Sequence, residues 1–262
     1  MELTFLGTGG AFTDFRVNYH NNLVVDCGFL DGEQVERYIL IDCGATAVQS
    51  LKELGIKSWE VEGVVVTHLH GDHVGGIEQL LWERFYTGPH GPGFKKTALY
   101  ATPDVLEGVQ QFLTPCVDEF TSEDGIARVE GYAALVEEVP SMEFDEAEFT
   151  WHLGHVQVRF HRTPHVESDY ASKPAYGIEL ISAATGGSAY YTSDTMFRSE
   201  IGELFPDAQI IFHDCTFSPK YKGTVHTHYE DLLTLDDETR SRIILMHHTQ
   251  VPEPSTSSDD PR

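Results

Sequence analysis

The six-residue segment HLHGDH, residues 68–73, constrains this chain more than any other feature, because it concentrates four metal-binding side chains. It follows VEGVVVT, a β-branched run that is typical of a buried strand. His68 and His70 point to the same side of an extended backbone, since side chains alternate along a strand. The glycine after them loosens the turn, so that Asp72 and His73 can face a neighbouring position. Imidazoles and a carboxylate at this spacing favour zinc or another borderline divalent metal over a plain polar turn.

Segments typical of strands and of helices alternate along the chain. Strand-like patterns occupy residues 3–6, 21–30, 37–44, 61–67, 149–160, 175–181, 187–194, 208–214 and 242–248, and helical spacing occupies residues 47–56, 77–85, 104–113 and 228–235. This order favours a layered α/β fold. Each candidate metal ligand falls where a predicted strand ends, as a site on the edge of a rigid sheet requires.

The composition indicates which binding partners and which cellular compartment to expect. The chain of 262 residues has 42 acidic and 17 basic residues, and its formal charge of −25 disfavours a large nucleic acid, which binds to basic surfaces. The alternative is that the acidity only reflects solubility or a salty habitat. The four cysteines are scattered, the N-terminus does not look like a signal peptide, and no apolar run is long enough to span a membrane. We therefore expect a soluble, cytoplasmic protein with no membrane partner.

We expect one domain over residues 1–250, followed by a polar, Pro/Ser-rich tail over residues 251–262 that is disordered.

The HxHxDH pattern at residues 68–73 resembles that of the metallo-β-lactamase superfamily, and the resemblance extends along most of the chain. It implies an α/β fold with four layers, an αββα sandwich that holds the metals at one edge between two sheets. Asp42 matches an acidic residue that usually supports the metal loop in this superfamily.

The resemblance also places the remaining ligands. His165 matches the third histidine, Asp194 the bridging aspartate, and His247 the last ligand, with the adjacent His248 left as an alternative. The implied cofactors are two divalent metal ions, Zn²⁺ in our expectation and Mn²⁺ as the alternative. The resemblance implies that one ion is bound by His68, His70 and His165. It implies that the other is bound by Asp72, His73 and His247, with Asp194 between the two ions.

Two further motifs resemble the ribonuclease Z-like phosphodiesterase branch of the superfamily. IIFHDCTF contains Asp214, and VHTHYEDLL contains His226, which lies 21 positions before His247. The resemblance makes His226 the proton donor to the leaving oxygen and Asp214 its partner, so Asp72, Asp214 and His226 are the expected catalytic residues. A histidine that merely caps a helix, or a role for His228 instead, remains the alternative.

The distance along the chain from His165 to Asp194, 29 positions, leaves no room for the tRNA-binding arm of ribonuclease Z. The chain then resembles cyclic-nucleotide phosphodiesterases of the superfamily, including the anti-Pycsar proteins. We expect hydrolysis of a small phosphodiester, a 3′,5′-cyclic nucleotide, to the 5′-monophosphate by a homodimer. The alternatives are a ribonuclease Z-type tRNA 3′ endonuclease, a hydrolase of esters, thioesters or lactones, and a non-enzymatic binding module.

The segment LWERFYTGPHGPGF offers aromatic side chains for a base, namely Trp82, Phe85, Tyr86 and Phe94, although core or dimer contacts explain them equally well.

Overall fold

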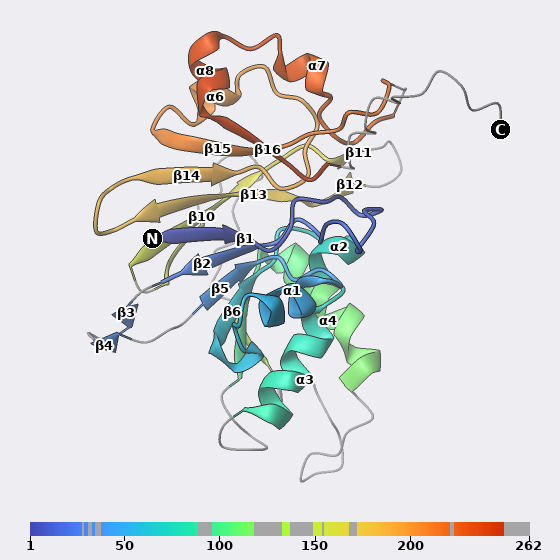
Figure 1. The fold of residues 1–262 in the computed structure, drawn as a ribbon, viewed down its shortest axis with the longest axis vertical. Helices are drawn as coiled ribbons and strands as arrows, with labels where there is room; N and C mark the ends of the chain where they lie inside the picture. Colours follow the sequence, from blue (N-terminus) through green and yellow to red (C-terminus); the bar gives the residue numbers. More distant parts are fainter. Residues whose placement is uncertain are drawn as a thin grey trace, which may run out of the picture.

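The computed structural model describes residues 1–27, 29–30, 33–34, 38–88, 96–117, 133–136, 149–153, 155–167, 172–220 and 223–248. Within these residues two mixed sheets of six strands lie face to face (Figure 1). The predicted tail over residues 251–262 lies outside the described residues, as does Phe94, so the expected domain boundary stays a prediction.

The first sheet comes from the N-terminal half of the chain. Its strands, in spatial order, are β1 (Glu2–Phe5), β2 (Leu23–Asp26), β5 (Tyr38–Ile41), β6 (Val61–Val65), β7 (Thr97–Tyr100) and β8 (Ala133–Val136). β1, β2 and β5 pair antiparallel, and β5 through β8 pair parallel. The β-branched run forms β6 at a central position, where most of its side chains are buried from both sides.

The second sheet comes from the C-terminal half. Its strands, in spatial order, are β16 (Ile243–Met246), β15 (Ala208–Asp214), β14 (Ser188–Tyr191), β13 (Tyr176–Ser182), β10 (Val156–Arg162) and β9 (Phe149–Leu153). β14, β15 and β16 pair parallel, so their carboxyl ends meet at one edge of the sheet. Two small hairpins complete the described strands, β3 (Phe29–Leu30) with β4 (Glu33–Gln34) and β11 (Val166–Glu167) with β12 (Ser172–Lys173).

Helices cover the outer face of each sheet (Figure 1). On the first sheet they are α1 (Ala47–Glu53), η1 (Ser58–Glu60), α2 (Gly71–Val74), α3 (Ile77–Thr87) and α4 (Pro103–Val117). On the second they are α6 (Ile201–Leu204), α7 (Tyr229–Leu232) and α8 (Asp237–Arg242). Helix, sheet, sheet and helix make the four layers of an αββα sandwich, and the expected fold class is confirmed.

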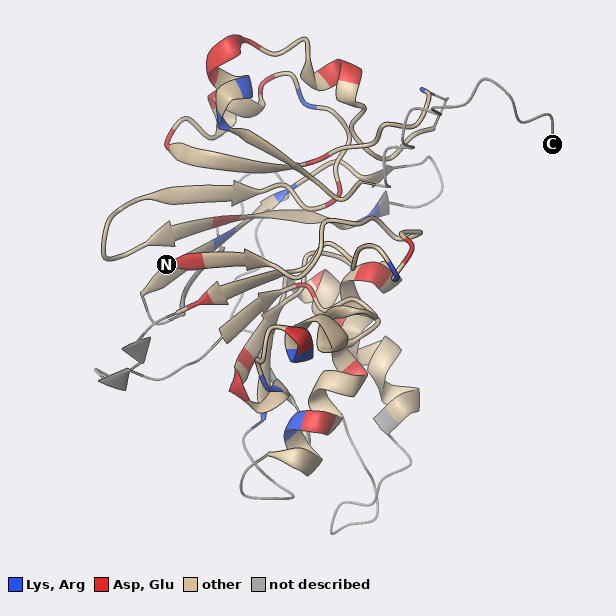
Figure 2. Cartoon of the chain, viewed as in Figure 1, with Lys and Arg blue, Asp and Glu red and all other residues tan. Residues whose placement is uncertain are grey.

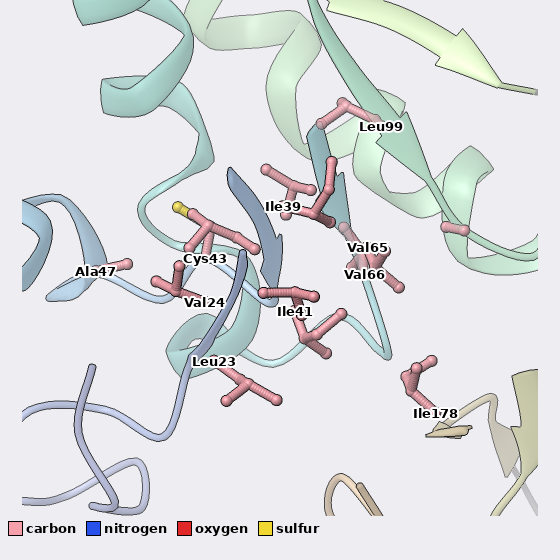
Figure 3. Packing of buried hydrophobic residues seen from close by; sticks show 14 of the residues in the cluster. Leu23, Val24, Ile39, Ile41, Cys43, Ala47, Val65, Val66, Leu99 and Ile178 are labelled. Carbon is pink, nitrogen blue, oxygen red and sulfur yellow. The ribbon is translucent and has the colours of Figure 1, made fainter. Parts of the chain in front are cut away.

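The hydrophobic core joins the two sheets. One cluster of buried side chains contains Leu23, Ile41 and Val65 from the first sheet together with Ile178 from the second (Figure 3). Phe160 of the second sheet belongs to the same cluster. Because the same core packs on both sheets, the strand ends at the edge of the sandwich are held in a fixed relation to one another.

The predictions of single helices and strands are confirmed at some positions and wrong at others. Gly55 follows the C-terminal end of α1 with a φ of +80°, a left-handed conformation that glycine adopts readily, as the predicted C-terminal stop requires. The expected helix over residues 228–235 is wrong in length, since α7 contains only one turn, and β7 was not predicted.

Acidic residues lie on both helical layers (Figure 2), including Glu78 on α3 and Asp237 on α8. Among the described residues no helix combines the length and the apolar character needed to cross a bilayer.

Candidate metal centre

All the predicted ligands lie just beyond strand ends, where the edges of the two sheets meet. The first sheet contributes His68 and His70 after β6, with Asp72 and His73 on the first turn of α2. The second sheet contributes the other three, each after a different strand: His165 after β10, Asp194 after β14 and His247 after β16.

Three residues at these strand ends hold a backbone conformation that side chains seldom adopt. Asp42, Ser193 and His247 have φ values of 63°, 53° and 55°. Such conformations persist only where the surroundings enforce them, and they gather at functional sites. All three residues are buried at this edge of the sandwich.

The first group of ligands, which we call the histidine cradle, consists of His68, His70 and His165. His70 Nδ1 lies 3.0 Å from His68 Nε2 and 3.1 Å from His165 Nε2. Two nitrogens bound to one tetrahedral zinc ion at about 2.0–2.1 Å would lie roughly 3.3 Å apart. The observed spacing therefore fits a shared ion.

The second group, the carboxylate cradle, consists of Asp72, His73 and His247. Asp72 Oδ2 lies 3.0 Å from His247 Nε2 and 3.4 Å from His73 Nε2. All three side chains are buried. The prediction that His247 rather than His248 faces the site agrees with this geometry, because the ring of His248 instead contacts Phe217 with centroids 5.9 Å apart.

Asp194 lies between the two cradles and turns one oxygen to each. Its Oδ2 lies 3.7 Å from His68 Nε2 and 3.6 Å from His165 Nε2 in the histidine cradle. Its Oδ1 lies 3.2 Å from both His73 Nε2 and His247 Nε2 in the carboxylate cradle. This is the arrangement that a bridging carboxylate requires.

The donor atoms fit divalent metal ions. The four donor atoms of each cradle, Asp194 included, lie within 4.8 Å of one another. His73 Nε2 and Asp194 Oδ1 are buried, and neither makes a hydrogen bond within the described residues. Buried polar atoms without a hydrogen bond are costly, and a bound cation would satisfy both.

Polar side chains behind the cradles hold the ligands in place. Asp42 Oδ2 accepts a hydrogen bond of 2.7 Å from His73 Nδ1, which leaves Nε2 free to bind a metal. Thr67 Oγ1 donates to the same carboxylate at 2.8 Å and accepts a hydrogen bond of 2.8 Å from Ser193 Oγ. His165 Nδ1 donates to the carbonyl of Val225 at 2.9 Å, which orients that ring in the same way.

The sequence reasoning missed Thr67 and Ser193, and it also missed Asn22. The amide of Asn22 donates to the carbonyl of Asp72 at 3.2 Å and accepts from the backbone of Gly44 at 3.0 Å. Asn22 therefore ties the metal loop to the turn after β5. The only available signal was the pair of asparagines directly before a buried strand.

His226 and Asp214 lie together beside the cradles, as expected. His226 Nδ1 donates to Asp214 Oδ2 at 2.9 Å, and the same oxygen accepts from the backbone of Thr195 at 2.9 Å. Burial opposes the charge on His226, but its contact with Asp214 outweighs burial and raises the pKa of the imidazole. The other oxygen of Asp214 faces His247 Nδ1 at 3.4 Å, so one carboxylate serves both histidines.

His228, the competing candidate, donates from Nδ1 to the carbonyl of Ser218 at 3.0 Å. Its ring lies outside the clusters of candidate ligands that the described residues form.

The aromatic segment LWERFYTGPHGPGF has a structural role where it is described, since Trp82 and Phe85 pack against the main core.

The sandwich and the paired cradles at its edge define a metallo-β-lactamase-fold protein. The metallo-β-lactamase fold protein YhfI from Bacillus subtilis superimposes with a TM-score of 0.68 at 17% identity, over 95% of this chain and 87% of that chain. The short form of human tRNase Z superimposes with a TM-score of 0.66 at 19% identity, over 95% of this chain and 93% of that chain.

The family is more specific than the fold. The family model described as anti-Pycsar protein Apyc1 matches residues 1–261. An anti-Pycsar protein Apyc1 from Paenibacillus sp. (strain J14) is 30% identical over 252 residues, which cover 95% of this chain and 89% of that protein. The chain belongs to the anti-Pycsar Apyc1 family, and the expected family is confirmed.

Proposed function

We propose that this protein is a metal-dependent phosphodiesterase that hydrolyses a 3′,5′-cyclic nucleotide to the 5′-monophosphate. One observation carries the proposal: two ligand cradles share Asp194, with the His226–Asp214 pair directly beside them. Membership of the anti-Pycsar family supports it, because the sequence resembles the cyclic-nucleotide phosphodiesterases among which those proteins are counted.

The two cradles would hold two divalent ions. Together they offer five imidazole nitrogens along with the oxygens of Asp72 and Asp194, a donor set that suits Zn²⁺, with Mn²⁺ as the alternative. When bound, such ions lower the pKa of water and neutralise charge on phosphoryl oxygens.

The residues of the chain orient and protonate the substrate. His226 has a side chain that is 28% exposed, so a substrate on the cradles can reach it from solvent. Asp214 fixes Nδ1 of that ring, which leaves Nε2 to deliver a proton to the departing sugar oxygen. The contact with Asp214 raises the pKa of His226, which favours the protonated ring that a proton donor needs.

The size of the substrate follows from the space around the site. Between His165 and Asp194 the described residues form the small hairpin of β11 and β12 and then β13 and β14 of the second sheet, so few of the 29 positions are left for a substrate-binding arm. A net charge of −25 also disfavours a long polyanion. A small cyclic phosphodiester fits both observations, whereas a tRNA precursor fits neither.

We extend the proposal to a homodimer in the cytoplasm. The support is the resemblance to dimeric relatives and the free thiols of Cys27, Cys43 and Cys215, which suit a reducing compartment. Light scattering after size exclusion would measure the mass of the assembly, and a monomer would refute this part of the proposal.

A substrate panel tests the function. Purified protein with added Zn²⁺ or Mn²⁺ is given cyclic mononucleotides, bis(p-nitrophenyl) phosphate, a tRNA precursor and a thioester. We expect turnover of cyclic mononucleotides to the 5′-monophosphate. Turnover of the thioester alone would refute the phosphodiesterase proposal, and efficient cutting of the tRNA precursor would refute the argument from size.

The His226→Ala variant separates the general acid from the ligands. We expect it to retain its metal and to lose about 100-fold or more in kcat on cyclic nucleotides. It should lose less on bis(p-nitrophenyl) phosphate, whose leaving group needs no proton. Loss of metal in this variant would show that His226 is a ligand.

A further inference from the structure

The loop between β1 and β2 exposes large apolar side chains to solvent. Phe12 is 94% exposed, Val17 63% and Phe15 52%. Isolated exposed apolar residues are common, but three within six positions of one loop form a patch of the kind that marks a binding surface.

This loop is ordered by its own hydrogen bonds. The side chains of Asn18 and Thr8 bond at 3.1 Å across its base, and Asn18 Oδ1 also accepts from the backbone of Thr8 at 3.2 Å. At its tip the backbone of Thr13 donates to the carbonyl of Gly10 at 3.0 Å. Phe15 packs edge-on against His20 with ring centroids 5.0 Å apart. The loop that carries Phe12 is therefore ordered already, and it loses little conformational entropy when a ligand binds.

The base of the loop touches the metal centre directly. The backbone of His248 donates to the carbonyl of Thr8 at 2.9 Å. A Cβ atom added to Gly10 would lie only 3.3 Å from Cε1 of His247, so the loop backbone lies against the last predicted ligand. In Figure 1 the loop runs to the same side of the molecule as α2, which contains Asp72 and His73.

The short stretch of chain between Gly10 and Phe12 keeps the backbone of Phe12 near the site. Phe12 lies two positions after Gly10, and the Cα atoms of residues two positions apart are at most about 7 Å from each other. The Cα atom of Phe12 therefore stays close to His247, the last predicted ligand, from which a nucleoside would extend when its phosphate lies on the cradles. Its exposed faces are available to a planar ligand.

We propose that Phe12 stacks on the nucleobase of a substrate whose phosphate lies on the cradles. The inference rests on the proposed function and adds to it the residue that recognises the base. A stacking contact suits so acidic a protein, because a neutral base is recognised through its π-face without any cationic side chain. Stacking tolerates every base, so Phe12 would supply affinity for nucleotides as a class.

The test compares Phe12→Ala, Phe12→Leu and Phe12→Tyr on a cyclic nucleotide and on ribose 3′,5′-cyclic phosphate, which lacks the base. Phe12→Ala should raise KM for the nucleotide about 10-fold with little change in kcat, since stacking on one base contributes on this order. Phe12→Tyr should restore KM, and Phe12→Leu should not. The matched control is Phe112→Ala, which removes a side chain that is 44% exposed on α4 and leaves the centre unchanged.

The outcomes separate this inference from the function on which it rests. Wild-type protein that turns over no cyclic nucleotide would refute the proposed function. If the wild type is active and Phe12→Ala matches it, or raises KM equally for the substrate without a base, only the stacking role is refuted. Dissociation of an oligomer in Phe12→Ala, seen by size exclusion, would show instead that Phe12 contacts a second copy.

Discussion

The two cradles share Asp194 but differ in the charge that surrounds them. The histidine cradle is made of imidazoles, and one of them, His70, is only partly buried. The carboxylate cradle is buried throughout and contains Asp72, with Asp42 behind His73 and Asp214 behind His247. One edge of the sandwich therefore holds a neutral set of metal-binding side chains beside an acidic set.

This difference shifts the pKa values of the histidines in the two cradles in opposite directions when no metal is bound. Burial lowers the pKa of His68, His70 and His165, and neighbouring histidines lower it further. Burial also opposes the charge on His247, but Asp194 with Asp214 and Asp72 outweighs burial and raises its pKa to about 10. At His73, burial is likewise outweighed by Asp194 with Asp42 and Asp72, which raise the pKa well above its usual value. The comparison teaches that the carboxylate cradle favours positive charge, which a bound cation would supply, whereas the histidine cradle favours neutral rings.

The largest expected effect is at the residue that the cradles share. Asp194→Ala removes a donor from both, so we expect activity to fall to background and metal content to fall at both positions. Elemental analysis together with turnover of a cyclic nucleotide measures this. Full retention of either ion would show that the cradles do not share this carboxylate.

Matched deletions in the two cradles should differ in metal-free protein. His247→Ala leaves Asp72 and Asp194 buried with fewer partners, and breaking a buried charge pair costs about 3–5 kcal/mol of unfolding free energy. His70→Ala removes a neutral, partly buried ring, and about 1 kcal/mol is expected. Urea denaturation of EDTA-treated protein at pH 7 measures both, and equal losses would contradict the charge difference.

The cost of His247→Ala should depend on pH. A folded-state pKa of about 10 exceeds the unfolded value of about 6.5, so the stabilisation is complete below pH 6.5 and is lost as the pH rises toward 10. His70 has the opposite sign, because its lowered pKa costs stability as the pH falls below about 6.5. Thermal denaturation of the two variants and wild type between pH 5 and 10 tests the signs. A difference in stability between His247→Ala and wild type that does not change with pH would show that His247 is neutral in the folded protein.

A smaller effect is expected behind the carboxylate cradle. Asp42→Asn keeps the shape of the side chain but weakens the hydrogen bond that orients His73, and loss of such a partner costs about 10–100-fold in metal affinity. Competition with a chelator measures the affinity. Asp237→Asn on α8, whose side chain is 94% exposed, is the matched control. An unchanged metal affinity in Asp42→Asn would show that Asp42 does not support the metal centre.

Sequence patterns predicted the local part of this centre and needed the resemblance for the rest. The spacing of His68 and His70 after a β-branched strand is enough to align their rings, because alternation is a local rule. His165 and His247 approach them only through the packing of two sheets, which no spacing along the chain reveals. Their placement came from family motifs.

The supporting residues could not be predicted from the pattern. Thr67 and Ser193 are hydroxyl residues at strand ends, where such residues are common, and only the fold brings their oxygens to 2.8 Å. The exposure of Phe12 is likewise a property of the folded loop. β7 escaped prediction because its four residues, TALY, include Ala and Leu, which favour a helix at least as much as a strand.

Titration of metal-stripped protein with Zn²⁺, with cyclic-nucleotide turnover followed at each addition, tests most directly whether the two cradles work as a pair. Activity should be absent without metal and should reach its plateau only at the second equivalent per chain. Full activity in stripped protein, or a plateau at the first equivalent, would contradict a centre that holds two ions.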